Sequence, residues 1–289
     1  MKAIITVGIS CSGKTTLARE LGRKGWVDVN RDFLRFNVVC PGSDWSNYKF
    51  TKKRERDVTE LQKEMILSAA ELGQNVIISD TNLNPATREM WVKFCEELGY
   101  EIEIKDMSVS LEEAWRRDAL RKNGVGHQTI YKQWLKWLEY AGRKKYTPNP
   151  NMPRAVIVDI DGTLAQMNGR SPFQWDRVGE DDVRDVVADM VEGLSLTYQI
   201  IVVSGRDGVC YDETERWLVR NAIPFDALFM RECDDNQKDT IVKEEIFWNF
   251  IADYWNVVAV IDDRPCVCRM WTEIGIPNVI AVADQNIEF

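Results

Sequence analysis

The chain has 289 residues, of which 45% are hydrophobic, and its formal net charge is −9. This length favours two compact domains of about 100–200 residues each. No apolar run reaches about 18 residues and no signal-peptide pattern opens the chain, so the sequence predicts a cytoplasmic protein without a membrane span. The single histidine, His127, excludes multi-histidine metal sites, and acid–base chemistry must then rest on carboxylates, lysine or water.

Charge is distributed unevenly along the chain. Through Tyr146, 25 Lys and Arg residues face 20 Asp and Glu residues, whereas the remainder has 12 against 26. The first half is therefore mildly basic and the second half strongly acidic. A polyanionic substrate is compatible with the first half, although its excess of +5 is far from the signature of a dedicated nucleic-acid binder.

The segment YTPNPNMPR, residues 146–154, marks the predicted domain boundary because its three prolines forbid regular structure. We assign residues 1–146 to a first domain, 147–153 to a linker and 154–289 to a second domain. On both sides, short apolar runs alternate with longer helical patterns, which is typical of a parallel sheet covered on both faces. The sequence thus predicts an α/β protein of two domains, each a mostly parallel sheet flanked by helices.

GISCSGKTT, residues 8–16, follows the apolar run KAIITVG and opens a helical pattern, which is the context of a phosphate-binding loop. Its glycines let backbone N–H groups wrap a phosphate, Lys14 can reach the β- and γ-phosphates, and Thr15 can hold Mg²⁺. An ordinary glycine turn is the alternative. The candidate ATP-binding residues are Gly8, Ser12, Gly13, Lys14, Thr15 and Thr16.

VNRDFLRF, residues 29–36, supplies a candidate acceptor site. If a helix begins near Asp32, then Asp32 and Arg35 share a face, and the carboxylate could take a proton from an acceptor hydroxyl while Arg35 grips a phosphate on that acceptor. Taken alone, an N-cap aspartate followed by a solvated arginine explains the pattern as well. Further on, ISDTNLNP places Asp80 and Thr81 at a strand end, before a helix that starts at Pro85.

RRDALRKNG, residues 116–124, places Arg117 and Arg121 on one helical face before a loop that contains glycine. A closing lid would deliver a cation to transferring phosphates in this way, and a solvated basic face is the alternative. The residues alone do not decide between Arg117 and Arg121.

In AVIVDIDGTLA, residues 155–165, two aspartates two positions apart follow an apolar strand. This DxDGT pattern resembles the motif of haloacid-dehalogenase-type phosphotransferases, which implies Asp159 as nucleophile and Asp161 as acid and base. Mg²⁺ would bind Asp159 and the Ile160 carbonyl and shield the attacking carboxylate. Later segments offer further candidates for this phosphatase site: Ser204, with Arg206 nearby, as a phosphate donor, then Lys243, and then Asp262 and Asp263 to complete the metal site. Taken separately, each can also be read as a turn, a solvated helix residue or a helix cap.

Both constellations in this order, with NRD, SDTNLNP, DGTLAQMNGR and VKEEIFW around them, resemble the bifunctional polynucleotide 5′-kinase/3′-phosphatases of T-even-like bacteriophages over nearly the whole chain. The resemblance implies Lys14 and Thr15 at ATP and Mg²⁺, Asp32 as general base and Arg35 at the 3′-phosphate of the acceptor. It also implies Asp80 and Thr81 on the acceptor side and Arg121 as the lid arginine. In the phosphatase it adds further functional positions: Arg170, Arg231 and Asp239.

The leading hypothesis is an end-healing enzyme that phosphorylates 5′-hydroxyl ends of RNA or DNA with ATP and removes a 3′-phosphate or 2′,3′-cyclic phosphate. The resemblance also implies that the protein acts together with an RNA ligase and forms a homotetramer. If the chain is phage-encoded, it implies a location in the host cytoplasm. A small-molecule kinase, for nucleosides or sugars, fused to a metabolite phosphatase is the alternative, because both folds host many substrates. A nucleotide-gated RNA-binding module with inactive sites is disfavoured by the presence of Asp32, Asp159 and Asp161.

Overall fold

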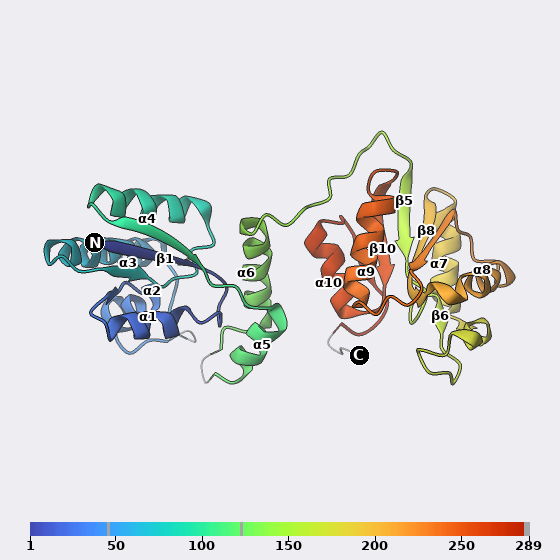
Figure 1. Ribbon diagram of the computed structural model, residues 1–289, viewed down its shortest axis with the longest axis horizontal. Helices are drawn as coiled ribbons and strands as arrows, with labels where there is room; N and C mark the ends of the chain where they lie inside the picture. The colour runs from blue at the N-terminus through green and yellow to red at the C-terminus, as the bar shows by residue number, and fades with distance from the viewer. Residues whose placement is uncertain (45–46, 122–123, 286–289) are drawn as a thin grey trace. The chain divides into compact units, whose positions relative to one another are not determined.

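The computed structural model describes residues 1–44, 47–121 and 124–285. The chain divides into two compact units, Met1–Arg143 and Lys144–Phe289 (Figure 1). Tyr146, which the sequence analysis placed at the end of the first domain, packs in the second unit against Phe247, and its hydroxyl donates to the carbonyl of Trp255. The boundary in the structure therefore lies three residues earlier than predicted.

The first unit is built on a parallel sheet of four strands in the order β2-β3-β1-β4. Its strands are β1 (Lys2–Val7), β2 (Val27–Asp28), β3 (Val76–Ile78) and β4 (Glu101–Asp106). β1 corresponds to the apolar run KAIITVG, and β3 ends just before Asp80 and Thr81, which the sequence analysis placed at a strand end. The sequence analysis missed β2, because two residues are too short to show any periodicity.

Helices cover both faces of this sheet. On one face, Ala3 and Ile5 pack with α3 and α4, whereas on the other Ile4 packs with Ala18 of α1. This alternation follows from the two-residue period of a strand. The helices are α1 (Lys14–Gly22), α2 (Arg31–Leu34), α3 (Lys52–Glu71), α4 (Pro85–Glu97), α5 (Leu111–Ala119) and α6 (His127–Tyr140), and a π-helical turn, Arg35–Val39, continues α2.

The second unit contains a parallel sheet of five strands in the order β11-β10-β5-β8-β9. Its strands are β5 (Arg154–Val158), β8 (Gln199–Asp207), β9 (Ala227–Arg231), β10 (Asn256–Asp262) and β11 (Val279–Ala281). A short antiparallel ribbon, β6 (Ala165–Gln166) with β7 (Asp182–Val183), follows the DxDGT segment. The predicted α/β architecture of two parallel sheets is confirmed.

Two core clusters hold the helices of the second unit against its sheet. Ala155 and Ile157 pack with α9 and α10, and Val156 and Val158 pack with α7 and α8. These helices are α7 (Asp185–Ser195), α8 (Tyr211–Arg220), α9 (Asp239–Ile246) and α10 (Pro265–Ile274), with short turns of 3-10 or π type at Trp175–Glu180, Gly208–Cys210 and Phe247–Ile251. In both units several polar candidate residues, among them Asp80, Asp159 and Asp262, lie at or just after the carboxyl ends of strands, where sheets of this kind bind ligands.

Candidate active sites

The loop between β1 and α1 has the backbone geometry of a phosphate-binding loop. Gly13 precedes α1 with φ +97°, a conformation that favours glycine. At Gly8, a Cβ atom would lie 2.6 Å from the Met107 carbonyl oxygen, so no larger residue fits. Both predicted glycines are thus required by the backbone itself.

Lys14 lies folded into this loop. Its ammonium donates to the carbonyl oxygens of Gly8 (3.0 Å) and Ile9 (2.5 Å) and to Ser12 Oγ (3.2 Å), and its residue is only 8% exposed. Burial lowers the pKa of Lys14 to about 8. The partners are all neutral, so the charge is hydrogen-bonded without an ion pair.

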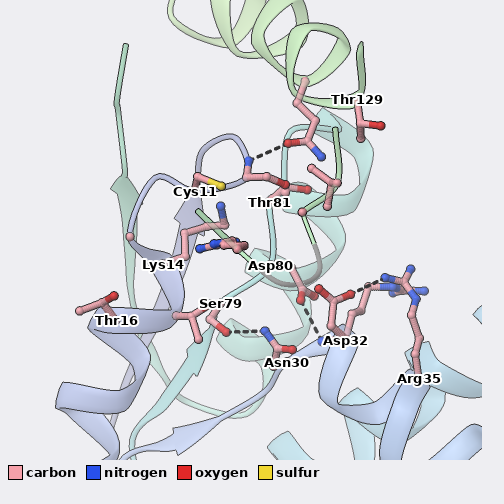
Figure 2. A pocket seen from close by; sticks show the side chains of 18 of the residues that line it. Cys11, Lys14, Thr16, Asn30, Asp32, Arg35, Ser79, Asp80, Thr81 and Thr129 are labelled. Atoms are coloured by element: carbon pink, nitrogen blue, oxygen red, sulfur yellow. Dashed lines mark hydrogen bonds and ion pairs between the residues drawn. The ribbon is translucent and has the colours of Figure 1, made fainter. Parts of the chain in front are cut away.

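A cavity of about 880 Å³ extends from this loop to α2 and the lid segment (Figure 2). It brings together most of the predicted kinase-site residues, from four separate parts of the chain. Two predicted residues do not line the cavity: Ser12 accepts a hydrogen bond from Lys14, and Gly8 fixes the loop backbone. The predicted residues that line the cavity are Gly13, Lys14, Thr15, Thr16, Asp32, Arg35, Asp80, Thr81 and Arg121.

Asp80 lies at the end of β3 and is held by neutral donors. Its Oδ1 accepts the backbone N–H of Arg31 (2.9 Å), and its Oδ2 accepts Gln62 Nε2 (2.8 Å). Burial raises the pKa of Asp80 to about 6, although both hydrogen bonds oppose the shift. The adjacent Thr81 supplies its carbonyl oxygen to Gly8 N, so this pair also anchors the phosphate loop.

Asp32 and Arg35 share a helical face, as expected from their spacing. Arg35 donates to Asp32 Oδ1 at 2.8 Å and, through two further nitrogens, to both oxygens of Glu55 at 3.1 and 2.5 Å. Asn30, rather than Asp32, caps α2 by accepting Phe33 N. The sequence analysis missed Glu55, because it comes from α3 and no local spacing connects it to Arg35.

Glu55 organises the acceptor end of the cavity. Besides Arg35 it accepts Arg31 at 3.1 Å and the hydroxyl of Tyr48 at 3.1 Å. Burial alone would raise the pKa of Glu55, but hydrogen bonds and charge from Arg35 and Arg31 outweigh burial and lower it. The guanidinium of Arg35 is therefore fixed between two carboxylates before any ligand binds.

The two candidate lid arginines have different surroundings. Arg121 lines the cavity, whereas Arg117 donates to Glu113 Oε1 (2.6 Å) and to the Cys11 carbonyl (3.0 Å) and is not part of the lining. Asp118, which the sequence analysis did not single out, accepts the backbone N–H groups of Val125 and Gly126 and so holds the loop that follows. Among the described residues, the geometry favours Arg121.

In the second unit, Lys243 of α9 links the predicted carboxylates. Its ammonium donates to Asp159 Oδ1 at 2.7 Å and to Asp262 Oδ2 at 3.0 Å, and it lies 3.5 Å from Asp239 Oδ2. Burial would lower the pKa of Lys243, but the three aspartates outweigh it and raise that pKa. Burial raises the pKa of Asp159, and the nearby ammonium opposes this shift.

Three buried carboxylates at the ends of β5 and β10 form a candidate cation site. Asp159, Asp262 and Asp263 each offer one oxygen, and these atoms lie within 4.8 Å of one another. Asp263 Oδ1 is buried without a hydrogen-bond partner, and a Cβ on Gly162 (φ +83°) would overlap the other oxygen of Asp263. Oxygen ligands of this kind fit Mg²⁺.

The Ile160 carbonyl, predicted as a metal ligand, is already used. It accepts the N–H groups of Thr163 (3.1 Å) and Ala165 (2.8 Å), which occupy both of its lone pairs. That part of the prediction is wrong, because the chain turns at Gly162 and closes onto Ile160. The next carbonyl, that of Asp161, accepts no hydrogen bond from the residues that the structure describes.

Asp161 is held by two arginines. Arg206 donates to both of its oxygens (2.9 and 2.8 Å), and Arg170 donates to Oδ1 (2.9 Å). Asp181, with a fully buried side chain, accepts both guanidinium groups, each with contacts of 2.7 Å. The sequence analysis missed Asp181, because it sits in a loop before β7 with no motif around it.

The remaining predicted residues surround the same cluster. Ser204 is fully buried and its Oγ accepts the N–H of Arg206 at 3.2 Å. Arg231 donates to the carbonyls of Gly205 (2.8 Å) and Gln237 (2.6 Å), and it lies 3.7 Å from Asp239. Arg231 thus shapes the loops around the site with most of its donors.

Comparisons with known proteins agree with this division. Residues 4–143 match a family described as an AAA domain, and residues 153–286 match the polynucleotide kinase PNKP phosphatase domain. A protein of Autographa californica nuclear polyhedrosis virus, named putative bifunctional polynucleotide kinase/RNA ligase, is 38% identical over 99% of this chain. The chain spans 43% of the length of that relative.

Two solved structures are also similar to the chain. One, "Structure of the Pnkp1/Rnl/Hen1 RNA repair complex", is 29% identical, covers 99% of this chain and 97% of its own, and has a TM-score of 0.47. The other, "Structure of Pnkp1/Rnl/Hen1 complex", is 28% identical, covers 98% of this chain and 96% of its own, and has a TM-score of 0.47. Along the described residues, no helix has the length and apolar character needed to cross a membrane.

The fold and the two sites define a protein that joins a P-loop kinase-type domain to a haloacid-dehalogenase-type phosphatase domain. Residues 153–286 are similar to the phosphatase domain of polynucleotide kinases, and the resemblance of the chain to the two-domain polynucleotide kinase-phosphatases is confirmed. The curated relative comes from a baculovirus, so the bacteriophage origin stays a prediction.

Proposed function

We propose that this chain heals broken nucleic-acid ends, transferring the γ-phosphate of ATP to a 5′-hydroxyl and removing a 3′-phosphate or 2′,3′-cyclic phosphate. One observation carries the proposal: each unit completes a different phosphate site from its own residues. The match of the second unit to a phosphatase domain of polynucleotide kinases supports polynucleotide ends over small metabolites as substrates.

In the kinase site, the loop amides and Lys14 would hold the phosphates of ATP, and Thr15 would hold Mg²⁺. Asp32 takes the proton of the acceptor 5′-hydroxyl while the hydroxyl oxygen attacks the γ-phosphorus. The bond between the γ-phosphorus and the bridging oxygen breaks, and ADP leaves. Arg35 binds the 3′-phosphate of the acceptor, Asp80 and Thr81 lie on the acceptor side, and Arg121 stabilises the transferring phosphoryl group.

In the phosphatase site, Asp159 attacks the phosphorus and forms an aspartyl-phosphate as the bond to the ribose oxygen breaks. Asp161 gives its proton to that oxygen and then takes a proton from the water that hydrolyses the aspartyl-phosphate. Asp159, Asp262 and Asp263 would hold Mg²⁺, with the Asp161 carbonyl in place of Ile160. The ion supplies positive charge that shields the attacking carboxylate from the anionic phosphate.

The other groups around the phosphatase site have supporting parts. The donors for phosphate oxygens are Lys243, Ser204, Arg206 and Arg170. The loops around these donors are positioned by Arg231 and Asp239. We further propose that an RNA ligase seals the ends that this chain prepares, because the name of the curated relative pairs the two activities. A homotetramer and a cytoplasmic location are parts of the same proposal.

Paired variants of the full chain test the proposal. Lys14→Ala is expected to abolish transfer of the γ-phosphate from ATP to a 5′-hydroxyl oligonucleotide while 3′-phosphate release continues, and Asp159→Asn is expected to do the reverse. If either variant lost both activities while still folded, two independent sites would be excluded. Preference for nucleosides or sugars over 5′-hydroxyl oligonucleotides would instead favour the small-molecule kinase.

A further inference from the structure

An exposed phenylalanine lies at the acceptor end of the kinase cavity. Phe50 lines that cavity and is 55% exposed, so much of its ring is accessible at the site. It precedes α3, three residues after the described chain resumes at residue 47. Nothing in the proposed chemistry of phosphoryl transfer uses an apolar ring there.

The ring of Phe50 is held in place by its neighbours. The buried Tyr48 presents its ring to Phe50 at 4.9 Å and an interplanar angle of 80°, and Phe36 packs on Tyr48 at 5.7 Å and 85°. The hydroxyl of Tyr48 donates to Glu55, which in turn holds Arg35. The ring and the phosphate-binding guanidinium are therefore fixed by one set of contacts.

The order of groups along the cavity is informative. Arg35 contacts Asp32 at 2.8 Å, and its guanidinium carbon lies over the Phe50 ring, 5.3 Å from the ring centre, so Arg35 neighbours both groups and leaves the opposite face of the ring for a base. If the reacting 5′-hydroxyl lies at Asp32 and the 3′-phosphate of the first nucleotide at Arg35, the next group along the strand is the second nucleotide. Its base then arrives at Phe50.

We propose that Phe50 stacks on the base of the second nucleotide of the acceptor strand, just beyond the phosphate held by Arg35. Aromatic rings bind bases of single strands through their faces with little regard for sequence, which suits an enzyme that accepts many ends. This inference rests on the proposed kinase function and adds a subsite to it. It predicts that strands bind better than single nucleotides.

The test compares two acceptors in the full chain carrying Asp159→Asn, so that the 3′-phosphate of an acceptor is not removed. One acceptor is a short 5′-hydroxyl oligonucleotide, and the other is a nucleoside 3′-monophosphate, which has no second base. Phe50→Ala is expected to raise KM for the oligonucleotide about 5- to 150-fold with kcat retained. KM for the nucleoside 3′-monophosphate should rise much less, because Arg35 keeps its contacts with Asp32 and Glu55, and turnover of this acceptor also shows that the variant is folded.

Two matched comparisons separate stacking from packing. Phe50→Trp should restore the wild-type KM, whereas Phe50→Leu should not, because leucine keeps apolar bulk but lacks an aromatic face. An oligonucleotide that is abasic at its second position should bind the wild-type chain as poorly as it binds Phe50→Ala.

An equal rise of KM for both acceptors would overturn the inference, and so would full activity of Phe50→Leu on the oligonucleotide. If the chain with Phe50 intact phosphorylated neither acceptor, the proposed kinase function would fail, and that outcome is distinct from a failure of the subsite.

Discussion

Two buried lysines serve the two phosphate sites, and their surroundings differ. Lys14 is hydrogen-bonded to two carbonyl oxygens and one hydroxyl, all neutral, and burial lowers its pKa to about 8. Lys243 is surrounded by Asp159, Asp262 and Asp239, and their charges raise its pKa. The first site leaves its cation to be neutralised by a ligand, whereas the second neutralises it within the protein.

The same contrast applies to the carboxylates. Asp80 in the first site is hydrogen-bonded to a backbone N–H and an amide side chain, while Asp161 in the second site is paired with two arginines. If the first site binds and releases ATP, as proposed, it gains from charges that only the nucleotide satisfies. A site that performs nucleophilic attack gains from a carboxylate and donors fixed in advance.

Removal of the central lysine of the second site should have the largest effect on stability. Lys243→Met leaves the buried Asp159 and Asp262 without their cation and removes one cation from the partly buried Asp239, so we expect a loss of about 3–5 kcal/mol in unfolding free energy in metal-free buffer. Lys14→Met is the matched control, since it removes a charge with neutral partners and should cost only about 1 kcal/mol.

Hydrogen exchange of peptides from β5 and β10 measures the loss of stability in Lys243→Met. Exchange of peptides from β1 and β3 measures the loss in Lys14→Met. Equal losses in the two units would contradict the contrast between protein-compensated and ligand-compensated charge. Partial recovery of Lys243→Met on addition of Mg²⁺ would sharpen it, because the ion would supply the missing positive charge.

Asp80 should make the first unit less stable as pH rises. Its pKa of about 6, against the ordinary 3.8, means that the folded chain keeps a proton that the unfolded chain has lost between these values. Stability contributed by the neutral form is thus present below pH about 4 and lost as pH rises through about 6. Asp80→Asn should gain up to about 3 kcal/mol over the wild type across this window.

Urea unfolding at several pH values, followed by hydrogen exchange in β1 and β3, checks the pH dependence of this difference. A constant offset between variant and wild type is allowed, because the lost hydrogen bond to Gln62 does not titrate. A difference that stays flat from pH about 4 to 7 would mean that Asp80 is not perturbed by burial.

Asp181 should affect catalysis through the two arginines that it holds. In Asp181→Asn one acceptor oxygen is lost, Arg170 and Arg206 shift, and Asp161 is no longer fixed, so phosphatase kcat should fall about 100-fold. Kinase activity should be unchanged. Asp182→Asn, an exposed neighbour in β7, is the control and should retain phosphatase activity; a wild-type kcat for Asp181→Asn would exclude the positioning role.

The local geometry around residues that are close in sequence could be read from the sequence. The phosphate loop, the pair Asp32 and Arg35, and the DxDGT segment are each read from a few adjacent positions, because a strand end and a helix start fix their geometry locally. Glu55 and Asp181 could not be found in this way. Glu55 lies 20 and 24 residues from its two arginines, Asp181 lies 11 and 25 residues from its own, and no periodicity marks either carboxylate.

The order of residues alone determined two parallel sheets and which strand ends carry charge, since apolar runs, glycines and carboxylates act over a few neighbouring positions. Only the tertiary structure decided which distant groups compensate these charges: Asp159 and Asp262 compensate Lys243, and Glu55 compensates Arg35. Compensation depends on distances between elements that are far apart in the chain, and those distances are set by packing of the helices on the sheets.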